Sequence, residues 1–110
     1  MAKYLAKAKY TAPSGVKGLI EDGGSTRAAA VKALAESLGG TMEAFYFALG
    51  EVDAYVILDF PDVTAGVAAS LTVSASGQAT VEVVALITPE EMDAAVKKSP
   101  IYDAPGKADN

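Results

Sequence analysis

The chain has 110 residues, a formal net charge of −5, and no histidine, cysteine or tryptophan. Its high apolar content excludes a disordered chain, and its length fits one domain that can fold alone. The missing residue types exclude disulfides, thiolate or imidazole metal sites and a Ser-His-Asp triad. We therefore expect neither a metal nor a cofactor.

The charge also narrows the expected partners. Surplus carboxylate repels phosphate backbones, so we expect no nucleic-acid partner. No charge lies between Asp62 and Glu82, but the serines, threonines and glycines there are too polar for a membrane-spanning helix. The lysine-rich start of the chain lacks the apolar core of a signal peptide. We expect a cytoplasmic protein that does not insert into a membrane.

The first part of the chain predicts one strand and two helices. Residues 3–10 alternate between small or aromatic and mainly charged side chains, which is typical of a strand. A short helix is predicted over 14–21. A longer helix, capped by Ser25 or Thr26, is predicted to end at the glycine pair 39–40, because glycine tolerates the left-handed conformation at a helix end.

A hairpin follows. Residues 41–49 and 52–60 are rich in aromatic and β-branched side chains, which favour strands. The Gly-Glu pair at 50–51 suits a two-residue type II′ turn. Such a turn places Tyr46 opposite Tyr55.

A third helix, a fourth strand and a last helix complete the pattern. Asp62 begins a helix that Gly77 ends, and residues 79–87 alternate again as a fourth strand. The clearest helix start in the chain is at Thr88, which is predicted to be the N-cap. Pro89 takes the first helical position, and Glu91 completes a capping box. This last helix is predicted to reach about Lys98.

The order of these elements predicts an α+β fold of the ferredoxin-like βαββαβ type. In this fold a four-stranded antiparallel sheet carries its helices on one face only. We expect a single domain over residues 1–98 and a loosely held tail over 99–110.

The sheet face away from the helices mixes apolar, aromatic and charged side chains. Its predicted members are Leu5, Lys7, Lys9, Met42, Tyr46, Asp53, Tyr55, Ile57, Glu82, Val84 and Leu86. An exposed apolar patch usually marks an interface. We expect a second copy of the sheet to cover this one, in a homodimer or a higher homo-oligomer.

Two interpretations of the polar residues on that face stay open. In one, Lys7 and Lys9 pair across strands with Asp53 and Glu82. In the other, Tyr46 and Tyr55 form the floor of a pocket between two sheets, where Lys7, Asp53 or Glu82 binds a small-molecule ligand. The candidate ligand-binding residues are Lys7, Tyr46, Asp53, Tyr55 and Glu82.

A glycine pair precedes Arg27, the only arginine in the chain. Helix N-termini attract anions, and a guanidinium adds a fork of donors. However, the Gly-Lys-Ser/Thr ending of a P-loop is absent, and the adjoining Glu21 and Asp22 repel phosphate. We interpret the segment as a capped break between two helices.

The chain resembles the GYD domain family. The resemblance is carried in order by residues 1–11, 15–19, 29–40, 43–50 and 61–62. The family's signature, Gly-x-Tyr-Asp at the hairpin, stands here as Gly50-Glu51-Val52-Asp53, with valine in the place of tyrosine. The resemblance implies a small bacterial or archaeal protein with a dimeric α/β-barrel fold, and it implies no particular activity.

These observations favour a homo-oligomeric module that binds a small molecule or a partner at the sheet face. The alternative is a cofactor-independent enzyme, monooxygenase- or isomerase-like, by wider analogy with dimeric α/β-barrel proteins. In that alternative Asp53 or Glu82 acts as the base, and Tyr46 or Tyr55 acts as the donor.

Overall fold

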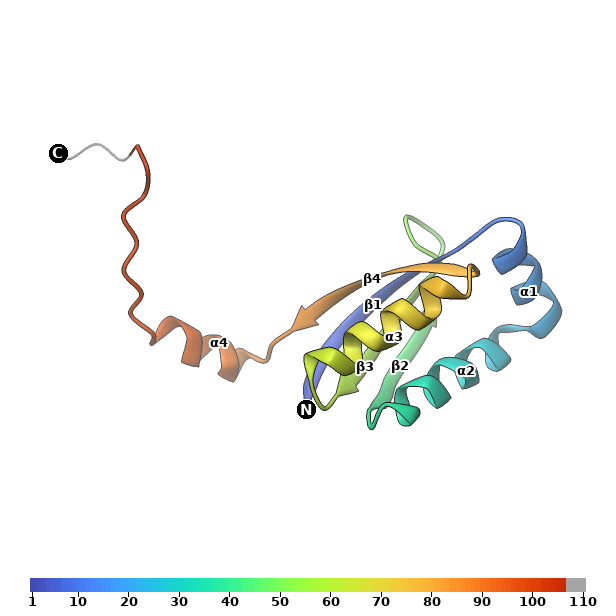
Figure 1. The fold of residues 1–110 in the computed structure, drawn as a ribbon, viewed down its shortest axis with the longest axis horizontal. Coiled ribbons are helices and arrows are strands. Elements are labelled where there is room, and N and C mark those ends of the chain that lie inside the picture. The colour runs from blue at the N-terminus through green and yellow to red at the C-terminus, as the bar shows by residue number, and fades with distance from the viewer. Residues whose placement is uncertain (107–110) are drawn as a thin grey trace.

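The computed structural model describes residues 1–106, and its elements follow the predicted order (Figure 1). The elements are β1 (Ala2–Tyr10), α1 (Ser14–Asp22), α2 (Gly24–Ser37), β2 (Thr41–Phe47), β3 (Ala54–Phe60), α3 (Val63–Ala75), β4 (Ala79–Leu86) and α4 (Pro89–Val96).

The four strands form one sheet in the order β2-β3-β1-β4. All three neighbouring pairs are antiparallel. Helices α2 and α3 lie over the same face (Figure 1). The predicted α+β, ferredoxin-like arrangement is therefore confirmed.

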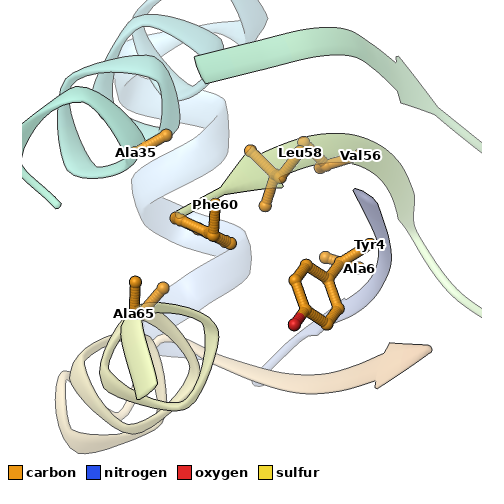
Figure 2. Packing of buried hydrophobic residues seen from close by; sticks show 8 residues of the cluster. Tyr4, Ala6, Ala35, Val56, Leu58, Phe60 and Ala65 are labelled. Atoms are coloured by element: carbon orange, nitrogen blue, oxygen red, sulfur yellow. The ribbon is translucent and has the colours of Figure 1, made fainter. Parts of the chain in front are cut away.

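Alternation along the strands decides which side chains enter the core. Tyr4 in β1 and Val56, Leu58 and Phe60 in β3 are buried beneath the helices. Figure 2 shows Phe60 between Ala35 of α2 and the α3 helix. The rings of Tyr4 and Phe60 have centroids 6.0 Å apart, a separation at which tilted aromatic pairs attract.

The hairpin keeps the predicted register but not the predicted turn. Tyr46 lies opposite Tyr55, as expected. The strands end at Phe47 and resume at Ala54, and Gly50 does not have the positive φ that a type II′ turn requires. The prediction was wrong because backbone hydrogen bonds of Asp53 hold a wider loop closed.

Met42 lies on the helix-covered face, so its predicted place on the other face was wrong. The register between β2 and β3 shifts between Met42 and Ala44, which is the mark of a β-bulge. Met42 therefore stands opposite Leu58 and packs against the core. The alternation of side chains along a sequence does not show where a β-bulge adds a residue to a strand.

The helix ends mostly follow their sequence signals. Gly39 has a φ of 79° at the end of α2, and Thr88 and Glu91 form the predicted capping box. Asp62 caps α3, and the amide of Ala65 that its side chain binds lowers the pKa of this carboxyl group. The predicted Ser25 or Thr26 cap was wrong, because α2 begins directly after Gly23, without a side-chain cap.

The C-terminal part of the described chain stands apart from the sheet (Figure 1). Helix α4 ends at Val96, two residues before the predicted end, and every residue over 87–106 is exposed. The rest of the predicted tail, residues 107–110, lies outside the described residues. Within the described chain, no helix has the length and apolar character needed to cross a membrane.

Gly40, in the turn between α2 and β2, offers a test of how closely that turn packs against β3. A Cβ atom there would overlap the Asp59 carbonyl oxygen and lie 2.8 Å from Phe60 Cδ1. We predict that Gly40→Ala lowers the free energy of unfolding by about 1–3 kcal/mol, as overpacking does. Gly50→Ala, where nothing lies within 4 Å, is the matched control. Equal urea midpoints for the two variants would contradict this packing.

Candidate functional site

Four of the five candidate residues form one row across the open face, the sheet face that α2 and α3 do not cover. Tyr46 lies opposite Tyr55, Tyr55 opposite Lys7, and Lys7 opposite Glu82. Neighbours in such a row have Cβ atoms about 4.5–5.5 Å apart. The row therefore combines two phenol groups, an ammonium group and a carboxylate on one surface.

Charge pairing on the open face involves a different lysine from the expected ones. Lys3 Nζ lies 2.9 Å from Glu43 Oε1 and 3.3 Å from Asp59 Oδ2. The hydrogen bond that the Lys3 ammonium donates to Glu43 raises the pKa of Lys3. Among the described residues Lys7 makes no ion pair within 4.0 Å, although Glu82 is its neighbour in the row.

A second row beside the first is apolar. Leu5 lies opposite Ile57 on one side and Val84 on the other, and Ala44 continues the row from β2. Val84 is 36% exposed, and Leu5 and Ile57 are partly exposed. The middle of the open face thus carries adjacent apolar side chains that are only partly buried.

Asp53, the fifth candidate, lies outside the row, in the loop before β3. Its Oδ2 accepts a hydrogen bond of 2.8 Å from the backbone amide of Tyr10, and its own amide donates to the carbonyl of Ala8. This carboxylate therefore ties the hairpin loop to the end of β1. In the described chain, no three acidic side chains gather closely enough to hold a metal ion.

The covered face holds a feature that the sequence reasoning missed, a cavity of about 330 Å³ between α2, α3 and the sheet. Its walls carry many small side chains, including Ala6, Ala30, Gly66 and Ala69. These side chains are too short to fill the space between the two helices. Alanine-rich helices were a visible signal, but the cavity needs residues from elements far apart in the sequence.

Arg27 lies at the cavity wall together with Tyr10 and Gln78. Its Nη1 donates to Gln78 Oε1 over 2.7 Å, and its Cζ lies 5.6 Å from the centre of the Tyr10 ring. Burial raises the pKa of Tyr10, and the positive charge of Arg27 opposes that rise. The segment interpreted from sequence as a plain helix break thus places its arginine against a cavity.

The hydrogen bond between the Asp53 carboxylate and the Tyr10 amide, which holds the hairpin loop against β1, can be tested by mutation. We predict that Asp53→Ala lowers the free energy of unfolding by about 1–3 kcal/mol, because the Tyr10 amide loses its acceptor. Asp53→Asn keeps an oxygen acceptor and is expected to lose less. Glu51→Ala, an exposed position in the same loop, serves as the control in chemical denaturation. An Asp53→Ala variant as stable as the Glu51→Ala variant would contradict the tether.

Comparison with known proteins agrees with the sequence resemblance. The family model described as GYD domain matches residues 4–96. No curated protein and no solved structure matched the chain. The matched segment runs from β1 to the end of α4 and includes the hairpin loop with Asp53. The chain belongs to the GYD domain family.

Proposed function

We propose that this protein is a homo-oligomeric binding module in which the open faces of two copies pack together. The observation that carries the proposal is the apolar row of Leu5, Ile57 and Val84, which lies on a face that no helix of the described residues covers. Complete burial of one such side chain contributes roughly 1.5–3 kcal/mol. A second copy supplies that burial with the surface that is already present.

The charges on the open face suit pairing of identical copies. A two-fold axis brings the same patch of each copy together, so a patch that carries both signs can complement itself. Lys7 and Glu82 are neighbours that make no ion pair with each other in the described chain. Across a two-fold axis, Lys7 of one copy can pair with Glu82 of its partner.

The C-terminal segment supports assembly independently of the sheet. Isolated helices shorter than about 12–15 residues are only marginally stable in water. Helix α4 spans eight residues and buries none of them. Met92 and Val96 in the helix and Ile101 and Tyr102 after it are exposed apolar side chains. Packing against a second copy would give this segment a surface on which to fold.

A small molecule would bind between the paired sheets, next to the apolar row. Tyr46 is 72% exposed and Tyr55 is 37% exposed, so both rings present contact area to a ligand. Lys7 and Glu82 at the other end of the row offer a donor and an acceptor. An apolar lining with few polar groups is the usual make-up of a small-molecule site.

Val84 gives the sharpest test of this assembly. We predict that Val84→Glu converts the oligomer to a monomer, because it places a charge in the apolar row that the second copy would bury. The matched control is Val16→Glu, on α1, where the valine is 40% exposed compared with 36% for Val84. Light scattering coupled to size-exclusion chromatography measures the mass of each variant.

The wild type and Val16→Glu are expected to elute as oligomers, and Val84→Glu as a folded particle near 11.2 kDa. Circular dichroism verifies that each variant is folded. A wild-type protein that is monomeric at micromolar concentration would overturn the proposal, as would an oligomer that Val84→Glu leaves intact.

A further inference from the structure

We propose that the cavity between α2 and α3 binds a small carboxylic acid with an apolar body, and that Arg27 receives its carboxylate. This site lies on the helix-covered face, and it is separate from the open face proposed above to pair with a second copy. Three features carry the inference: the shape and lining of the cavity, the unfinished bonding of Arg27, and the lack of a counter-charge among the lining residues.

The cavity has the size and chemistry of a small-ligand site. Its volume of about 330 Å³ lies at the lower end of the range for small-molecule pockets. Val31, Leu34, Val73 and Val81 are among the side chains that line it, together with alanines and aromatic rings. Such a lining favours an aliphatic or aromatic body, because burying apolar surface is favourable.

Arg27 is the charged group at this cavity, and its bonding within the protein is incomplete. Nη1 donates to Gln78, and the guanidinium lies over the Tyr10 ring. Nε is buried and meets no acceptor among the described residues. A buried donor without a partner costs free energy, so the described chain leaves the hydrogen bonding of this guanidinium incomplete.

No aspartate or glutamate is among the described residues that line the cavity, although the chain has more acidic than basic residues. Arg27 likewise forms no ion pair within the described chain. A partly buried charge is stabilised by an opposite charge held in hydrogen-bonding geometry. An anionic ligand supplies that charge, which the protein itself does not place there.

The guanidinium of Arg27 favours a carboxylate over a phosphate as the anionic group of the ligand. A guanidinium binds a carboxylate through two parallel hydrogen bonds. No lysine is among the described residues that line the cavity, so they supply no second positive charge to balance a phosphate dianion. Gln78, Ser76 and Thr72, which also line the cavity, add neutral polar groups. A monocarboxylate with an apolar body fits this set best.

The direct test measures binding to purified protein by isothermal titration calorimetry. Octanoate and phenylacetate are the probes, and the matching amides, octanamide and phenylacetamide, are the uncharged controls. We expect at least one acid to bind about tenfold or more tightly than its amide, since hydrogen bonds to charged groups are the stronger ones. Acids that bind no more tightly than their amides, or do not bind, would overturn the proposal.

Two pairs of variants on α2 locate the binding. Arg27→Gln is expected to weaken acid binding about tenfold or more, whereas Lys32→Gln makes the same change in net charge at an exposed position outside the cavity lining. Ala30→Leu places bulk at an exposed lining position and is expected to weaken binding of both acid and amide. Ala33→Leu is the control, because Ala33 is exposed and does not line the cavity.

If Arg27→Gln proves poorly folded, the comparison of Ala30→Leu with Ala33→Leu still tests the site. Unchanged acid binding in Ala30→Leu, or in a folded Arg27→Gln variant, would overturn the site. The outcome is independent of assembly, because Val84→Glu, on the opposite face of the sheet, is expected to keep acid binding. Loss of acid binding in the folded Val84→Glu monomer would likewise contradict a site contained within one copy.

Discussion

The two long helices cover one face of a four-stranded sheet, and no helix of the described chain lies over the other face (Figure 1). This one-sided cover is the constraint on which the rest of the structure depends. A strand sends alternate side chains to opposite faces, so each strand that contributes Tyr4 or Val56 to the core also places Leu5 or Ile57 outside it. The uncovered apolar row is therefore a consequence of the same alternation that builds the core.

Much of this architecture follows from local patterns. The alternation of β1 assigns Tyr4 to the core and Lys7 to the open face, and the hairpin register pairs Tyr46 with Tyr55 as predicted. Thr88 caps its helix through a short-range hydrogen-bond pattern that depends only on residues three positions apart. These features could be predicted because their causes are local.

The features that the sequence analysis predicted wrongly or missed depend on contacts between residues far apart in the sequence. The bulge beside Met42 depends on how β2 and β3 pair. The wide hairpin loop depends on hydrogen bonds between Asp53 and β1. The cavity beside Arg27 could not be predicted from one segment, because its lining comes from α2, α3 and all four strands. No single segment of the sequence shows that these side chains together leave a space.

The two faces of the sheet thus offer different chemistry. The open face carries an apolar row next to mixed charges, which suits a second copy of the same surface. The covered face has a mostly apolar cavity, partly open to solvent, with one guanidinium at its wall, which suits a small anion with an apolar body. None of the open-face residues Lys7, Tyr46, Tyr55 and Glu82 is among the described residues that line this cavity.

Face-to-face packing of the sheets is the central claim, and the most direct measurement is isotope-filtered nuclear Overhauser spectroscopy on a mixture of labelled and unlabelled protein. The account predicts intermolecular signals from the methyl groups of Leu5, Ile57 and Val84, which lie in one row on the open face. The absence of such signals from these methyl groups, with tumbling that matches an 11.2 kDa particle, would contradict it.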